Sequence, residues 1–68
     1  MSPNQVQITA EIRRHEFQQM GDVQVLKGFV YGDANGRFRD GEYIRTSIVD
    51  RIEGDLVFTA NSIYRVIN

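Results

Sequence analysis

The chain opens with apolar and polar side chains in strict alternation, and this pattern restricts the possible folds more than any other feature. One face of an extended chain would carry Val6, Ile8, Ala10 and Ile12. Polar residues occupy the positions between them and would face the opposite way. A period of two residues with one polar face is typical of a half-buried β-strand. The pattern therefore predicts a strand over residues 6–13.

Four later segments combine alternation with β-branched residues and are bounded by turn residues. We predict strands over residues 23–31, 43–52, 56–60 and 63–67. Residues 14–19 show no alternation and are too few for an independent helix, so we expect a loop or short turn there, closed by Gly21-Asp22. A short edge strand at residues 37–39 would place Phe38 inward.

The segment 23–31 has apolar side chains on both faces, which indicates burial on both sides by a curled sheet or by a neighbouring subunit. Gly28 lies in its middle and predicts a bulge or sharp bend, which a small barrel requires for closure. Five short strands with tight turns predict a mostly β fold. We expect a single domain over residues 1–68, a small five-stranded antiparallel barrel or curled sheet of the SH3-like type.

The chain has only 68 residues and no cysteine. A domain of this size has a thin stability margin, and here neither a disulfide nor a thiolate metal site can add to it. Self-association is one remaining remedy, so we expect a homo-oligomer. The N-terminal residues lack the pattern of a signal peptide, and no apolar run is long enough to span a membrane. We therefore expect a cytoplasmic protein without a membrane partner.

The formal net charge is −1, and acidic and basic residues are interleaved. Such a distribution lacks the basic stripe that attracts nucleic acid or anionic lipid. Of the eight basic residues, all but Lys27 are arginine. Arginine presents a planar fork of donors to carboxylate, phosphate or aromatic groups. The excess of arginine reflects either a compositional bias or an arginine-bearing recognition face.

No catalytic or metal-binding motif accompanies the single histidine, His15. A nucleophile elbow surrounds neither Ser47 nor Ser62, and no second histidine or cysteine could join His15 at a metal. The glycines do not form a phosphate-binding loop. We therefore expect His15 at the surface of a protein that is not an enzyme and needs no cofactor or metal.

One set of polar residues could form a binding site across the last three strands. We predict a ligand or partner site at Arg45, Ser47, Arg51, Asn61 and Tyr64. A hairpin turning at Gly54 would bring these residues together, and arginine with hydroxyl and amide groups can bind a phosphate or carboxylate. A structural alternative stays open, in which Thr46, Ser47, Asn61 and Ser62 satisfy backbone groups at a bulge.

Nucleic-acid binding is the alternative function. A barrel of this kind could use arginine and aromatic side chains for stacking and charge. The residues in question would be Arg37, Phe38, Arg39 and Tyr43. The aromatic residues, however, fall mostly at positions expected for the core.

The runs Asp40–Val49 and Val57–Val66 resemble small β-proteins encoded by phages, prophages and other mobile elements. This resemblance covers about the C-terminal half and implies an accessory factor. Members with assigned roles often counter host defence by blocking a protein machine or by sequestering a nucleotide signal. The resemblance thus implies a non-catalytic binding module in the host cytoplasm. Its expected partners are further copies of itself and either a host protein or a small nucleotide.

Overall fold

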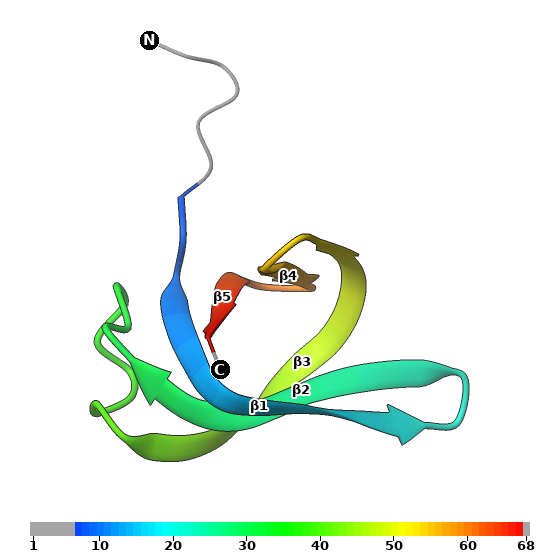
Figure 1. Cartoon of the computed structure of the whole chain (residues 1–68), viewed down its shortest axis with the longest axis horizontal. Helices are drawn as coiled ribbons and strands as arrows, with labels where there is room; N and C mark the ends of the chain where they lie inside the picture. Colours follow the sequence, from blue (N-terminus) through cyan, green and yellow to red (C-terminus); the bar gives the residue numbers. More distant parts are fainter. Residues whose placement is uncertain (1–6, 68) are drawn as a thin grey trace, which may run out of the picture.

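The computed structural model describes residues 7–67, which form a closed barrel of five β-strands (Figure 1). The strands are β1 (Ala10–Met20), β2 (Val23–Tyr31), β3 (Glu42–Glu53), β4 (Leu56–Thr59) and β5 (Ile63–Ile67). The predicted small, mostly β barrel of five strands is confirmed. Within residues 7–67 no helix has the length and apolar character needed to cross a membrane.

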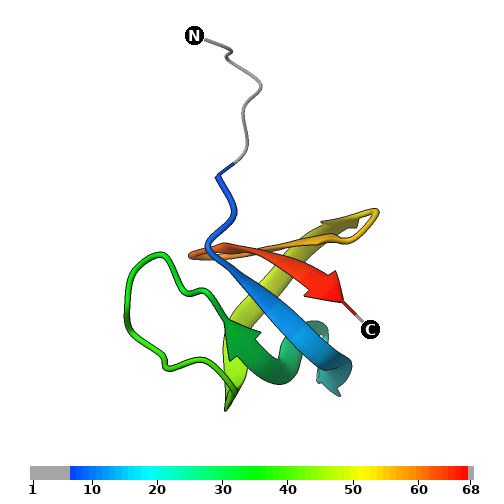
Figure 2. The same ribbon diagram turned by 60° about the vertical axis from the view of Figure 1, so that its left-hand side comes forward.

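The strands follow one another around the barrel in chain order, and β5 lies beside β1 to close it (Figure 2). The four successive pairs are antiparallel. The closing pair is parallel, from Ala10 opposite Tyr64 to Arg13 opposite Ile67. In a meander with an odd number of strands the first and the last run in the same direction, so this barrel closes with a parallel pair.

The core is small and draws on all five strands. Its buried residues are Ala10, Ile12, Leu26, Val30, Ile44, Val57 and Tyr64. The inward face predicted for the first strand is confirmed at Ala10 and Ile12, whereas Ile8 precedes β1 and is half-buried, and Val6 lies outside the described residues. Removal of apolar surface from water stabilises the barrel at roughly 25 cal/mol per Å².

The expected loop at residues 14–19 is wrong, because β1 continues through it to Met20. This half of β1 pairs with β2 as far as Met20 opposite Val23, and Gly21-Asp22 forms the turn. A register shift between Arg13 and Glu16 marks a β-bulge. The extra residue moves every later side chain to the opposite face. Uniform alternation is therefore lost from the sequence although the strand continues.

Gly28 lies opposite this bulge, and the mid-strand irregularity predicted from it is confirmed. A Cβ atom at Gly28 would overlap the Cγ2 methyl of Ile12. It would also come within 3.0 Å of the Arg13 carbonyl oxygen and 3.2 Å of the His15 Cα. Only glycine lets β1 approach β2 so closely at the bend.

Strand β3 contains two further irregularities, one opposite β2 and one opposite β4. Ile44 and Thr46 are buried as the alternation predicts, but Ile48 is 49% exposed. Val49 packs against the core in its place. The buried face of β3 therefore changes parity at Ile48, because the bulges shift the alternation.

The expected edge strand at residues 37–39 does not form, and residues 32–41 form a loop instead. The Asp33 carboxylate accepts hydrogen bonds from the backbone N–H groups of Asn35, Arg37 and Phe38. Asp40 accepts one from the backbone N–H of Gly32 at 2.8 Å. The Phe38 side chain packs against the core as expected. Carboxylates thus replace strand pairing as partners of the loop backbone.

We expect Gly28→Ala to destabilise the barrel by about 1–3 kcal/mol, because the methyl group has no space between β1 and β2. Gly36→Ala is a matched control: open space surrounds Gly36, but its φ of 66° is unfavourable for alanine, which costs roughly 1–2 kcal/mol. Urea denaturation should show the larger loss for Gly28→Ala. Equal or smaller loss at Gly28 would contradict the close packing at the bulge.

Candidate functional site

The structure does not gather the five residues of the predicted binding set into one site. Tyr64 is 4% exposed and belongs to the core, so it presents no ring to a ligand. Arg51 pairs with Glu53 at 2.7 Å and lies over the ring of Phe58 at the far end of β3. Asn61 is exposed in the turn between β4 and β5.

Arg45 and Ser47 do lie together, beside an apolar depression. Its lining is Met20, Val23, Val25, Arg45, Thr46, Ser47, Ile48 and Ala60. Val25 is buried there, while Met20 and Val23 are 43% and 37% exposed. The apolar outer residues of the segment 23–31 are thus only partly covered by the curl of the sheet.

The structural alternative accounts for Thr46. Its Oγ1 accepts a hydrogen bond from the backbone N–H of Leu26 at 3.1 Å and donates to the Ser47 carbonyl at 2.8 Å. These bonds lie at the β2–β3 register shift, where a regular ladder bond is interrupted. Thr59 acts similarly in the last turn, where its Oγ1 bonds both the N–H and the carbonyl of Ser62.

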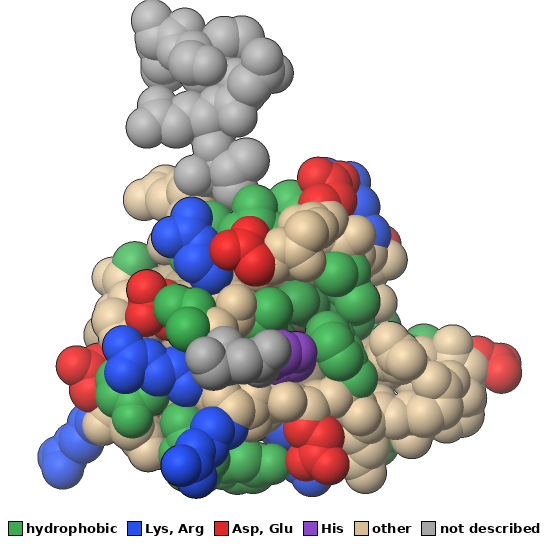
Figure 3. Space-filling view, in the orientation of Figure 1, with side chains coloured by type: hydrophobic (Ala, Val, Ile, Leu, Met, Phe, Trp, Pro, Cys, Tyr) green, Lys and Arg blue, Asp and Glu red, His purple; other side chains and the backbone are tan. Residues whose placement is uncertain are grey.

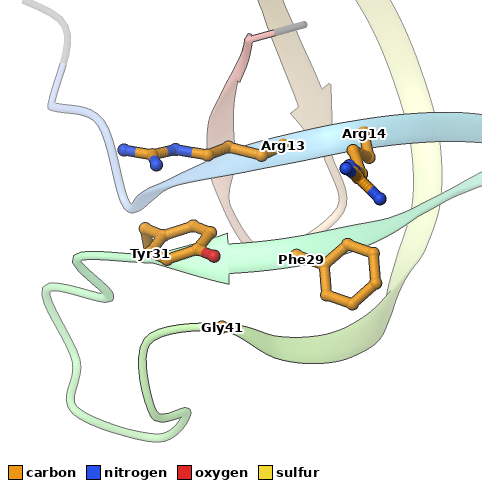
Figure 4. A pocket seen from close by; sticks show the side chains of 5 residues that line it. All are labelled: Arg13, Arg14, Phe29, Tyr31 and Gly41. Atoms are coloured by element: carbon orange, nitrogen blue, oxygen red, sulfur yellow. The ribbon is translucent and has the colours of Figure 1, made fainter.

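A different group of side chains forms a groove on the outer face of β1 and β2. An open cavity of about 480 Å³ is lined by Arg13, Arg14, Phe29, Tyr31 and Gly41 (Figure 4). The strand register places Arg13 beside Phe29, and Phe29 beside Tyr43 of β3. We call this surface the arginine–aromatic groove.

The aromatic rings of this groove are held by contacts with one another and with arginine. The guanidinium carbon of Arg13 lies 4.1 Å from the centroid of the Tyr31 ring, within cation–π range. The rings of Phe29 and Tyr43 meet edge-to-face, with centroids 5.0 Å apart and an interplanar angle of 67°. Tyr43 is 50% exposed, so an aromatic surface extends from the groove onto β3.

The bulge in β1 explains why two consecutive arginines line one groove. In a regular strand, Arg13 and Arg14 would point to opposite faces. Arg14 instead has a φ of 53°, a left-handed conformation that costs a non-glycine residue roughly 1–2 kcal/mol. Figure 4 shows the guanidinium of Arg14 directed toward Phe29, while that of Arg13 lies beside Tyr31. Strain of this kind often accompanies functional sites.

Gly41 forms the remaining wall of the groove, at the junction of the 32–41 loop with β3. Its backbone N–H donates to the Val30 carbonyl at 2.7 Å, and a Cβ atom at this position would lie 3.7 Å from the Tyr31 hydroxyl. The carboxylates that bind the loop backbone therefore also position this wall. Burial raises the pKa of Asp33, but hydrogen bonds from the loop N–H groups and the charge of Arg37 lower it by more.

The lining of the groove is suited to binding an anion beside a planar group. It offers two guanidinium groups and two aromatic rings, one of which carries a phenolic hydroxyl. His15 is half-buried and contacts Phe17 edge-on, with ring centroids 5.5 Å apart. In the described part of the chain, no three metal-ligating side chains come together.

The residues of the nucleic-acid alternative are also dispersed. Phe38 packs against the core, and the guanidinium of Arg37 covers its ring at 5.4 Å. Arg39 is exposed on the loop. Of the four, only Tyr43 extends the arginine–aromatic groove, through its contact with Phe29.

No protein-family model, curated protein or solved structure matches the chain in comparisons of sequence and fold. The groove residues Arg13, Arg14, Phe29 and Tyr31 were not grouped by sequence reasoning, because Arg14 was assigned to a loop. Two signals pointed toward them: the excess of arginine and the mid-strand Gly28. A β1 bulge opposite Gly28 places Arg13 and Arg14 on the same face as Phe29 and Tyr31.

Thr46→Val should destabilise the protein by about 1–3 kcal/mol, because the buried N–H of Leu26 loses its acceptor while the side-chain shape is kept. Thr46→Ser keeps the hydroxyl and serves as the control. Chemical denaturation of both variants measures the difference. A valine variant as stable as the parent protein would show that this hydrogen bond is dispensable.

A lowered pKa in the folded state means that the Asp33 carboxylate stabilises the loop above its unfolded pKa of about 3.9. That stabilisation is lost as the pH falls through the folded pKa. Asp33→Asn should therefore lower the thermal midpoint at pH 7. It should also make the decrease in thermal midpoint between pH 7 and pH 3 smaller than in the parent protein. Asp50→Asn, an exposed substitution of equal charge, should retain the full drop. Identical pH profiles for the two variants would contradict this role.

Proposed function

We propose that this protein is a non-catalytic binding module that captures a small nucleotide in the arginine–aromatic groove. The observation that carries the proposal is the bulge of β1, which brings Arg13 and Arg14 into the lining of one cavity together with the rings of Phe29 and Tyr31. The groove therefore combines a site for an anion with a surface for a planar ring. Nucleotides carry both groups in one small molecule.

Each part of the groove matches one part of such a ligand. Guanidinium groups donate paired hydrogen bonds to phosphate oxygens and stay charged at all physiological pH values. Tyr43 is half-exposed beside the half-buried Phe29, and these rings can stack with a base, as aromatic side chains do in single-strand binding proteins. The open cavity of about 480 Å³ is large enough to hold a small molecule.

The biological setting follows from the resemblance of the C-terminal half to accessory proteins of phages and mobile elements. In that setting, the protein would act in the host cytoplasm and withhold a nucleotide signal from a defence system. Blocking of a host protein is the other role that the resemblance implies. The groove supports sequestration of a nucleotide more directly, because it has the size and the donors for one.

Self-association belongs to the same proposal. A cysteine-free domain of 68 residues has little surface to bury by itself. Three large apolar side chains that border the depression at the β1–β2 hairpin are exposed: Met20, Val23 and Ile48. Contact with a second copy would remove such surface from water.

A single-stranded nucleic acid shares the chemistry of a free nucleotide, so length must be tested directly. Strand binding requires a basic track that follows several phosphates. Here Glu11 and Glu16 lie on β1 beside the groove, opposite Tyr31 and Lys27 of β2, and interrupt such a track. We therefore expect a mononucleotide or dinucleotide to bind as tightly as an oligonucleotide.

The test is calorimetric titration with a panel of mononucleotides, linear and cyclic dinucleotides and a ten-nucleotide oligomer. Arg14→Gly removes one guanidinium and relieves the left-handed strain. We expect roughly ten- to hundredfold weaker binding with an unchanged or higher thermal midpoint. The matched control, Arg51→Gln, removes a cation from the opposite end of β3 and should bind normally.

Unchanged affinity of Arg14→Gly would contradict the groove as the ligand site. If both the affinity and its salt dependence increase with the length of the oligonucleotide, the natural ligand is a nucleic-acid strand and not a free nucleotide. Absence of binding by the whole panel at low salt would overturn the proposal.

A further inference from the structure

The second half of β1 has an open edge. Strand β5 pairs with β1 only along Ala10–Arg13, and β2 occupies the other side of β1 throughout. No described strand pairs with the outer edge of residues 16–20. The end of the β1–β2 hairpin extends away from the barrel in Figure 1, and of these five residues only Phe17 is not exposed.

The turn determines which backbone groups face this edge. Met20 pairs with Val23 across a two-residue turn, which is closed by a hydrogen bond between its flanking residues. The N–H and C=O of Met20 therefore point toward β2. Because these directions alternate along an antiparallel strand, the backbone groups of Gln19 and Phe17 point to the open edge.

The usual protections of an edge strand are missing from this segment. Soluble β-proteins block open edges with proline, lysine, bulges or inward-pointing charges. Residues 16–20 read Glu-Phe-Gln-Gln-Met, with one charge and neither proline nor lysine. The bulge lies before this stretch, and the ladder from Glu16 to Met20 is regular. The edge is thus a template on which another strand can add.

We propose that the edge pairs antiparallel with the same segment of a second copy, about a twofold axis at Gln18. This inference rests on the self-association included in the proposed function and assigns it a surface. The pairing joins the two hairpins into one continuous sheet. In this pairing the backbone N–H and C=O groups of Phe17 bond those of Gln19 in the second copy, and the twofold symmetry repeats the same bonds on the other side of the axis.

Charge favours the axis at Gln18 over an axis at Gln19. With the axis at Gln18, Glu16 faces the uncharged Met20 of the second copy. With the axis at Gln19, Glu16 would instead face Asp22, and like charges directly opposite are destabilising. The register at Gln18 avoids this repulsion at both ends.

The first test uses the absence of cysteine from the chain. In the proposed register Gln18 faces its own copy as a non-hydrogen-bonded pair, with Cα atoms about 4.5 Å apart. This distance permits a disulfide. Gln18→Cys should form a covalent dimer on mild oxidation at low micromolar protein, and Gln24→Cys on the neighbouring strand should not. Equal cross-linking of the two variants would overturn the register.

The second test uses proline on opposite sides of one hairpin. Gln19 and Gln24 are paired, and as a non-hydrogen-bonded pair both direct their N–H groups away from each other. Gln19→Pro removes an N–H from the open edge of β1, whereas Gln24→Pro alters the other edge equally. We expect Gln19→Pro to raise the dimer dissociation constant at least roughly tenfold in sedimentation velocity, and Gln24→Pro to leave it unchanged.

The outcomes separate the edge from self-association in general. If Gln19→Pro dimerises as the parent protein does, the edge is not the interface, although self-association stands. If both proline variants become monomers, the contact depends on the whole hairpin and the assignment to the β1 edge fails. If the parent protein is a monomer at every concentration tested, both the edge pairing and the proposed self-association are overturned.

Discussion

The close approach of β1 and β2 at Gly28 is the constraint on which the rest of the barrel depends. Five short strands can close only if some of them bend sharply. Here the bend is made where the β1 bulge faces a residue without a side chain, so that Ile12 and the backbone of Arg13 fill the space of a Cβ. Any larger residue would force the strands apart and open the core between Ile12, Leu26 and Val30.

The same bend creates both surfaces to which we assign functions. It turns Arg14 onto the aromatic face beside Arg13, which a regular strand would not do. It also leads β1 away from β5, which ends its pairing at Arg13 and leaves the later edge open. One local irregularity thus separates a half of β1 that closes the barrel from a half that is available to a partner.

The fold was predictable because alternation survives between bulges. Residues 23–31 and 56–60 gave strands close to those observed, and Gly28 indicated the bend. The errors begin where one extra residue inverts the alternation: residues 14–19 lost their strand pattern, and Ile48 and Val49 exchanged faces. The predicted binding set is dispersed because two bulges separate Arg51 from Arg45 along β3, and because Tyr64 lies on the buried face of β5. Nothing in an isolated sequence distinguishes a bulge from a loop of the same composition.

The net charge of the chain gives no indication of the arginine–aromatic groove, because it includes carboxylates that are hydrogen-bonded to the loop backbone. Asp33 and Asp40 accept hydrogen bonds from the loop backbone, and Glu42 accepts one from the N–H of Arg39. Their charges are directed into the loop and away from a ligand. Among the described residues, Arg14 has no acidic partner. Arg13 pairs with Glu11 at 3.5 Å, so Arg14 supplies the unpaired positive charge that a ligand meets in the groove, although the chain as a whole carries −1.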